Sequence, residues 1–285
     1  NSEKNIDLNV VFANLSTLII REIYYGGCQA VAGGTYQKDQ YIEVYNNSTQ
    51  TQYLDSLMVG AINPYNSTTN NSWAGKDTIA VPPLGLFMVP GDGTTYPLEP
   101  GESAVFTINA VDHTSLATSA LKLNKAHFAL YHTMFKNQNE PDPSVTTMER
   151  VAPHTLGTPN SYTLSVSSPA VVIYRIPNLP SYFANLETWQ KIEPGKGENS
   201  TKFYHIDKSW IIDGVECVAR AADAVKRLPV DVDVSYTLLS ETFKGNCVTR
   251  KVQKKLPSGQ KIYQDTNNSA EDFITDVPAN PTLRP

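Results

Sequence analysis

The chain has 285 residues, and its 23 basic and 28 acidic side chains give a formal net charge of −5. Charged residues make up only 18% of it, against about 25% in a typical globular protein, and Asn, Ser, Thr and Tyr supply the missing polarity. This composition excludes a coiled coil, and the abundant aromatic and β-branched residues exclude a disordered chain. A negative net charge and the lack of a long basic stripe also argue against nucleic acid as a partner.

Short apolar or alternating runs dominate the chain, and each is bounded by glycine, proline, asparagine or serine. Such runs predict β-strands. The predicted strands cover residues 18–24, 40–45, 52–59, 86–89, 103–109, 127–131 and 170–176. Side chains alternate along a strand, so Ile42 and Val44 fall on one face of the second run. Tyr41, Glu43 and Tyr45 fall on its other face.

Helical patterns are scarce and short. Residues 179–190 predict one or two helical turns, and the alanine-rich residues 217–226 predict a short helix. Many short strands with frequent turns favour an all-β fold, an antiparallel sandwich with little helix.

The sandwich is expected to span residues 18–285, with a Pro-rich insertion near residues 133–162. A structureless loop of that length is unusual, so the insertion is expected to be functional or partly ordered over the surface. Residues 8–12 are also patterned as a strand, and residues 1–17 are therefore interpreted as the end of a truncated N-terminal domain or as a linker.

Several short motifs follow one another in a recognisable order. They include YIEVYN at residues 41–46, LEPGE at 98–102, WIIDGV at 210–215 and GNCVTRK at 245–251. This order resembles that of lamin-tail-like domains. The resemblance is nearest to a domain of unknown function in uncharacterised exported lipoproteins of Bacteroidota.

The resemblance implies an immunoglobulin-like sandwich of the lamin-tail type with long loop insertions. It also implies export to the periplasm or to the outer-membrane surface. A lipid anchor outside residues 1–285 would then be the link to the membrane. The resemblance implies no established catalysis, and a shared fold cannot supply a function by itself.

The three cysteines, Cys28, Cys217 and Cys247, include no C-x-x-C pair, which argues against a thiolate zinc site. Their odd number leaves at least one thiol unpaired. Two interpretations stay open: three buried, inert thiols, or a bridge between Cys217 and Cys247, which would suit an exported protein.

Aromatic residues that lie near proline, asparagine or glycine are the main indication of binding. Such side chains stack on sugars or anchor a protein partner. The alternative is that each of them covers the end of the sandwich core. The candidate ligand-binding residues are Tyr65, Trp73, Tyr96, Tyr182 and Trp189, and Phe183 shares their setting.

The segment from Asp265 to Asp272 is dense in oxygen ligands and is a weak candidate for calcium through Asp265, Asn267 and Asp272. The EF-hand spacing is absent, so a turn closed by side-chain hydrogen bonds is the favoured interpretation. Glu22 and Glu43 are a second candidate pair, as the two carboxylates of a glycoside hydrolase. They are more simply explained as partners of backbone or arginine groups.

These patterns favour a non-catalytic, exported cell-envelope protein that binds a protein, glycan or nutrient ligand through its loops. One alternative is an accessory surface lipoprotein of an outer-membrane TonB-dependent uptake system, whose receptor would be its partner. A second alternative is a hydrolase, although the G-x-S-x-G and H-E-x-x-H motifs are missing. No catalytic residue is assigned.

Overall fold

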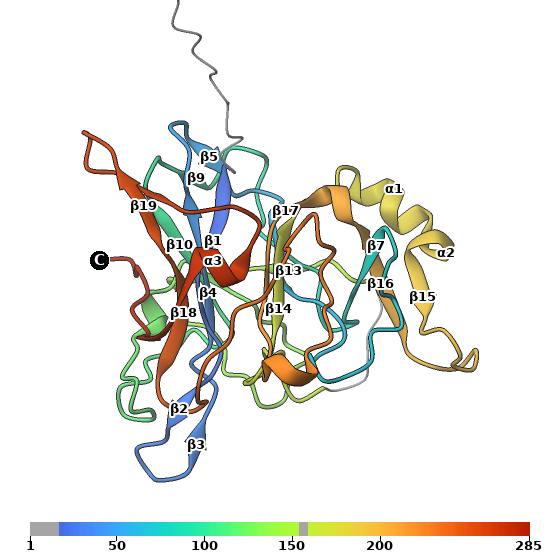
Figure 1. Cartoon of the computed structure of the whole chain (residues 1–285), viewed down its shortest axis with the longest axis horizontal. Coiled ribbons are helices and arrows are strands. Elements are labelled where there is room, and N and C mark those ends of the chain that lie inside the picture. The colour runs from blue at the N-terminus through green and yellow to red at the C-terminus, as the bar shows by residue number, and fades with distance from the viewer. Residues whose placement is uncertain (1–16, 154–158) are drawn as a thin grey trace, which may run out of the picture.

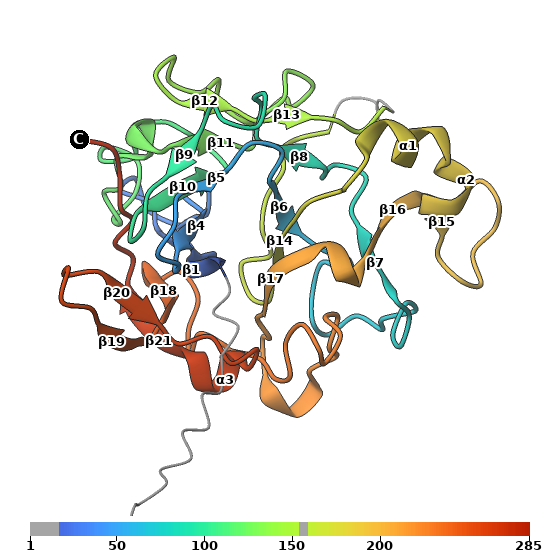
Figure 2. The same cartoon turned by 90° about the horizontal axis from the view of Figure 1, so that it is seen from above.

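A computed structural model describes residues 17–153 and 159–285 of the chain. Its strands form three layers, which lie side by side in both Figure 1 and Figure 2. The first and second sheets pack face to face over the main core, and the third sheet packs on the far face of the second. The predicted all-β sandwich with little helix is therefore confirmed. The third sheet is an additional layer that was not predicted. The strand predicted at residues 8–12 lies outside the described residues.

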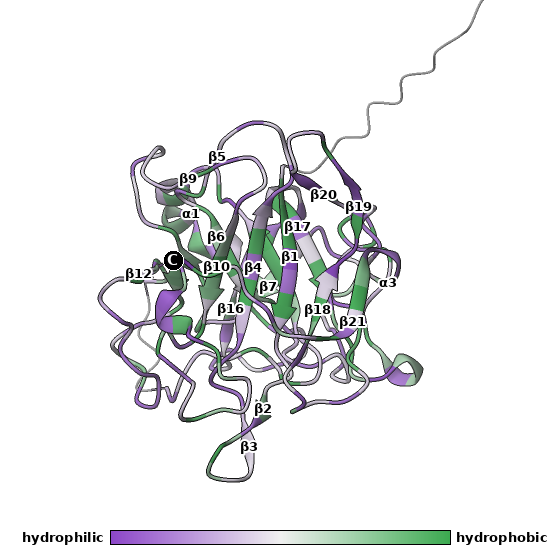
Figure 3. Ribbon diagram, turned by 90° about the vertical axis from the view of Figure 1, so that its left-hand side faces the viewer, coloured by the Kyte–Doolittle hydropathy of each residue, from purple (hydrophilic) through white to green (hydrophobic). Residues whose placement is uncertain are grey.

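The first sheet has seven strands in the described part of the chain. They are β12 (Thr146–Thr147), β11 (Phe128–Ala129), β10 (Ser103–Thr107), β4 (Tyr41–Asn46), β1 (Leu18–Tyr24), β18 (Asn246–Arg250) and β21 (Phe273–Pro278), in spatial order. Figure 3 views this sheet from its outer side. Ile42 and Val44 face the core, and Tyr41 and Tyr45 lie in clusters on the other face, as the alternation predicts.

The strands from β10 to β21 pair antiparallel, but β11 runs parallel to both β10 and β12. The predicted antiparallel sandwich thus has parallel pairing at this one edge. A parallel pair needs a long connection that returns the chain to the same end of the sheet. The segments 108–127 and 130–145 are connections of that kind.

The second sheet is buried on both faces. Its strands, in spatial order, are β13 (Glu149–Arg150), β8 (Phe87–Met88), β6 (Met58–Ala61), β14 (Ala170–Tyr174) and β17 (Ile211–Glu216). In β14, Val171 and Ile173 belong to the core shared with the first sheet, whereas Val172 and Tyr174 belong to the core shared with the third. This explains why β14 is apolar throughout rather than alternating.

The third sheet is short, and two of the helices directly precede its first strand in spatial order. Its strands, in spatial order, are β15 (Gln190–Ile192), β16 (Lys202–Asp207) and β7 (Thr78–Val81). Helices α1 (Leu179–Ala184) and α2 (Leu186–Trp189) precede β15 and confirm the predicted helical turns. The side chain of Asn178 caps α1 by accepting a 2.9 Å hydrogen bond from the Ser181 amide.

The remaining elements are short. They are the hairpins β2 (Cys28–Gln29) with β3 (Thr35–Tyr36) and β19 (Val252–Lys255) with β20 (Lys261–Tyr263), the pair β5 (Gln52–Tyr53) with β9 (Pro97–Leu98), helix α3 (Ser269–Asp272), and the 3-10 turns Leu123–Lys125, Lys208–Trp210 and Ala221–Asp223.

Two predicted elements differ in the structure. The predicted strand 52–59 is divided into β5 and β6 by a turn, where Asp55 accepts backbone hydrogen bonds from residues 93, 95 and 96. The predicted helix 217–226 is reduced to a 3-10 turn. A buried ion pair explains the second difference, because Glu216 holds the Arg227 side chain at 2.7 Å and also accepts the Arg227 backbone N–H.

The guanidinium of Arg250, on β18, is buried where the first and second sheets meet. Its Nη2 donates to both carboxylate oxygens of Asp213, on β17, at 2.8 and 2.9 Å. Its Nη1 donates to Asp265 at 3.1 Å and to Asp272 at 3.2 Å. Its Nε donates to the carbonyl oxygen of Ile20, on β1, at 2.8 Å. One side chain thus joins three strands, the turn before α3 and the last residue of α3.

Asp213 completes this connection from the second sheet. Its Oδ2 accepts the backbone N–H of Ile20 at 2.7 Å, so β17 is bonded to β1 as well as to β18. Burial raises the pKa of Asp213 to about 7, Arg250 opposes that rise, and the charge of Asp265 adds to it. Three carboxylates share the charge of Arg250, and loss of that cation would leave them uncompensated in a dry environment.

Replacing Arg250 tests how much this cluster contributes to stability. We expect Arg250→Met to lower the free energy of unfolding by about 3–5 kcal/mol, because buried carboxylates lose their cation. Arg220→Met is the matched control, since Arg220 pairs with Asp223 at the surface and such pairs contribute less than about 1 kcal/mol. Urea unfolding of both variants gives the comparison. Equal losses in the two variants would contradict the importance of the cluster.

The three cysteines are free, buried and in different places. Cys217 lies in the core between the first and second sheets, whereas Cys247 lies in a cluster on the outer face of the first sheet. The bridge between them is therefore absent, and the interpretation as three separate thiols is confirmed. Burial raises the pKa of both the Cys217 and the Cys247 thiol, which disfavours the reactive thiolate.

Because all three thiols are buried, they should be unreactive in the folded protein. We expect the native protein to resist a maleimide reagent and the urea-unfolded protein to take up three equivalents, one for each free thiol. Mass spectrometry counts the labels. Fewer than three labels on the unfolded, unreduced protein would show that a disulfide exists.

Candidate functional site

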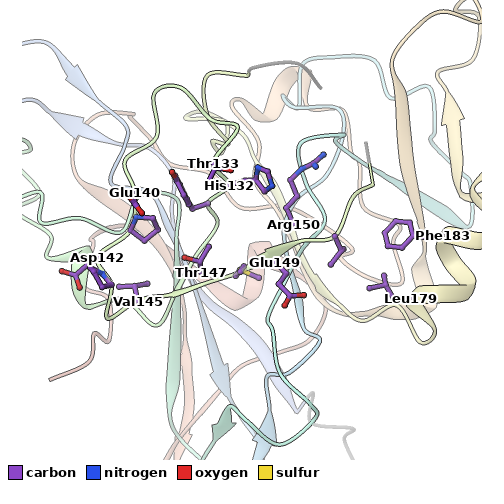
Figure 4. A pocket seen from close by; sticks show the side chains of 15 residues that line it. His132, Thr133, Glu140, Asp142, Val145, Thr147, Glu149, Arg150, Leu179 and Phe183 are labelled. Carbon is purple, nitrogen blue, oxygen red and sulfur yellow. The ribbon is translucent and has the colours of Figure 1, made fainter. Parts of the chain in front are cut away.

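A groove of about 840 Å³ runs between the insertion and helix α1. Figure 4 shows its side chains, with Asp142 and Val145 at one end and Leu179 and Phe183 at the other. The segment 145–151 forms its floor. We call this feature the edge groove, because its floor follows the edges of two sheets.

The floor of the edge groove links the first sheet to the second. Within it, β12 pairs with β11 at the end of the first sheet, and β13 pairs with β8 at the end of the second. Met148, between them, is only 2% exposed and packs into the main core. Among the described strands, β12 and β13 are the outermost members of their sheets, so the Pro-rich insertion closes one side of the sandwich.

The edge groove carries more acidic than basic groups. Glu140, Asp142 and Glu149 line it together with Arg150. The guanidinium of Arg150 donates to the carbonyl oxygens of residues 83 and 152, which fixes it in the wall. Burial and the nearby Arg150 charge lower the pKa of His132, so this imidazole is neutral at pH 7. The groove therefore has an excess of negative charge.

The end of the groove at α1 is apolar. Leu179 and Phe183 project into it from the helix, as Figure 4 shows. Phe183 packs edge-on against Tyr182, with ring centroids 5.2 Å apart. Tyr182 is buried, and its hydroxyl donates to the carbonyl oxygen of His205 at 2.9 Å. The buried Tyr182 ring thus restrains the Phe183 ring on the side away from the groove.

The aromatic residues predicted for ligand binding lie in four places. Tyr182 and Trp189 stack on each other, with centroids 5.6 Å apart, over the third sheet. Tyr96 packs against Phe128 and the main core. Tyr65 is 45% exposed, and Trp73 lines a separate cavity. None of these five lines the edge groove, whereas Phe183 does.

The calcium candidates lie in the Arg250 cluster. Asp265 and Asp272 accept hydrogen bonds from Arg250, and Asp272 also accepts the backbone N–H of Thr266 at 2.8 Å. Asn267 adopts a left-handed conformation in the turn between them. A guanidinium and turn amides therefore occupy the oxygens that calcium would need. Among the described residues, no three histidine, cysteine or carboxylate side chains are placed to hold a metal ion.

Glu22 and Glu43 lie opposite each other on β1 and β4, on the outer face of the first sheet. Arg21 contacts the Glu43 carboxylate at 2.5 Å and the Glu22 carboxylate at 3.4 Å. The Tyr41 hydroxyl donates to Glu22, and backbone amides of residues 280 and 282 donate to the two carboxylates. Burial raises the pKa of Glu22. Both carboxylates are thus closed off by the C-terminal segment.

The sequence did not single out Glu149, Thr147 or the other polar residues of the edge groove. Charged residues in a Pro-rich segment are usual at a surface, so their identity carried little information. The available signal was the length of the insertion, which exceeds what a simple connection needs. The position of Phe183 beside a capped helical turn was a second signal.

None of the helices in residues 17–153 and 159–285 has the length and apolar character that crossing a membrane requires. No curated protein matches the sequence. The chain is similar to a solved crystal structure of a DUF4876 family protein from Bacteroides thetaiotaomicron, with a TM-score of 0.80 and 29% sequence identity. The similarity covers 94% of this chain and 72% of that one. A family model described as "Protein of unknown function (DUF4876)" matches residues 99–280, and the chain therefore belongs to this family.

Proposed function

We propose that the protein is a non-catalytic, exported cell-envelope protein that binds an extended, basic segment of a partner protein in the edge groove. The similar protein comes from a Bacteroides species, which agrees with the lineage of the exported proteins that the sequence resembles. The lamin-tail type of the sandwich and a lipid anchor belong to this proposal. The observation that carries the binding function is that the groove follows the outermost strands of two sheets.

An extended segment suits this groove because of its floor. Outermost strands present backbone N–H and C=O groups on one side, and a peptide can add to them as a further strand. In the edge groove, β12 and β13 follow one another with only Met148 between them. A ligand that lies along both strands therefore spans the junction of the first and second sheets.

A basic segment suits the groove because of its charge. Glu140 is exposed on its wall and Glu149 on its floor, and the Asp142 carboxylate lies at one end. Lysine or arginine side chains of a bound segment would be attracted to these carboxylates, chiefly through faster association. The apolar end at Leu179 and Phe183 offers a place for one large side chain, which would set the register of the segment.

The other candidate roles stay predictions. An accessory role beside a TonB-dependent outer-membrane receptor is compatible with peptide binding, and neighbouring genes that encode such a receptor would support it. A glycan or nutrient ligand is an alternative occupant of the edge groove, whose carboxylates also accept hydrogen bonds from hydroxyl groups.

The affinity of the protein for labelled peptides tests this proposal directly. We expect labelled extended peptides rich in lysine and aromatic residues to bind, as measured by fluorescence anisotropy, and their acidic counterparts not to bind. Glu149→Lys reverses a charge on the floor and should weaken binding by about tenfold or more. Added salt should weaken binding as well, because exposed charges are screened.

Glu187→Lys is the matched control, since Glu187 is exposed on α2 and does not line the groove. It changes the net charge equally and should leave the affinity within about twofold. Equal binding of basic and acidic peptides, or equal loss in the two variants, would overturn the proposal.

A further inference from the structure

A second cavity, of about 490 Å³, lies between the loop that ends at Asp77, the start of β7 and the segment Arg227–Asp231. We call it the Trp73 cavity, because Trp73 is the aromatic residue in its wall. It shares no lining residue with the edge groove. Its residues have no part in the proposed peptide binding.

Trp73 is fixed in the wall before any ligand arrives. The residue is only 8% exposed, and the side-chain oxygen of Asn71 accepts its backbone N–H at 3.1 Å. The Asn71 amide in turn donates to the carbonyl oxygen of Lys226 at 3.0 Å. The indole ring packs edge-on against His205, with ring centroids 4.4 Å apart. A rigid aromatic wall of this kind loses little freedom when it binds a ligand.

Two polar atoms beside the cavity lack partners in the described part of the chain. They are the indole Nε1 of Trp73 and the ring Nε2 of His205, and both are buried. His205 is neutral at pH 7, because burial lowers its pKa to about 4, and its Nδ1 is bonded to the Thr78 hydroxyl at 2.9 Å. A buried N–H without an acceptor is unfavourable, so a ligand oxygen that accepts from Trp73 would be bound preferentially.

The rim of the Trp73 cavity carries charges of both signs, and exposed Lys76 adds a further cation to the lining. Lys208 lies between Asp231, at 2.9 Å, and Asp77, at 3.5 Å, on its rim. Two other cations of the lining have internal partners. Arg227 is paired with buried Glu216, and the Lys226 amine donates to a backbone carbonyl oxygen at 2.6 Å. The rim therefore offers both hydrogen-bond donors and acceptors to a ligand.

We propose that the Trp73 cavity binds a neutral saccharide unit. Vicinal hydroxyl groups each donate and accept, which matches a rim where Lys208 adjoins two carboxylates. A hydroxyl oxygen can accept the Trp73 N–H, and the apolar face of a sugar ring can pack on the indole. This site goes beyond the proposed peptide binding and does not depend on it.

Saturation-transfer NMR with glucose, galactose, mannose and N-acetylglucosamine tests the site. At least one of these sugars should bind at millimolar concentration, and Trp73→Phe, which keeps an aromatic ring but loses the N–H, should weaken that binding by about tenfold. Trp189→Phe is the matched control, because Trp189 lies outside the cavity, and it should leave the affinity unchanged.

A second variant guards against a folding defect in Trp73→Phe. Asp231→Asn alters only the exposed rim and should weaken binding by about threefold to tenfold. Glu149→Lys in the edge groove should have no effect on sugar binding, which separates the two sites. The proposal is overturned if no sugar of the panel binds, or if Asp231→Asn and Trp73→Phe both bind as tightly as Trp189→Phe.

Discussion

The buried guanidinium of Arg250 is the contact on which the two main sheets depend for their relative position. Its ligands come from β1, from β17, from the turn before α3 and from the end of α3, which are remote from one another in the sequence or the fold. Because hydrogen-bonding directions are fixed on a planar guanidinium, small shifts of one sheet against the other would break several bonds at once. The edge groove benefits from this rigidity, since its floor must span the distance between the same two sheets.

Much of the sandwich follows from local sequence patterns. Strand β1 has the predicted bounds, and β4 differs by one residue at each end, because each is a short apolar or alternating run bounded by turn residues. The third sheet was not predicted. Its strands β15 and β16 contain polar and charged residues, and only pairing with β7, more than a hundred residues earlier, gives them their place. Local periodicity carries no information about such pairing.

The candidate sites were predicted less well than the fold, and for a physical reason. Proximity to proline or asparagine in the sequence indicates a loop, but a loop residue can still point inward. Tyr182 does so at a capped helix start, whereas the mostly buried Trp73 still lies in the wall of the Trp73 cavity. The carboxylates of Asp265 and Asp272 were correctly attributed to a turn, but their cation, Arg250, comes from another strand. Charge partners that are distant in the sequence can be identified only when the fold is known.

A double-mutant cycle on Arg250 and Asp213 measures whether the Arg250 charge compensates the Asp213 carboxylate. Asp213→Asn removes one buried negative charge, so it should offset part of the loss caused by Arg250→Met. We expect the double variant to be more stable than the sum of the two single losses implies, by about 1 kcal/mol or more. Strict additivity of the two losses would contradict the claim that the Arg250 charge compensates Asp213 at the junction of the sheets.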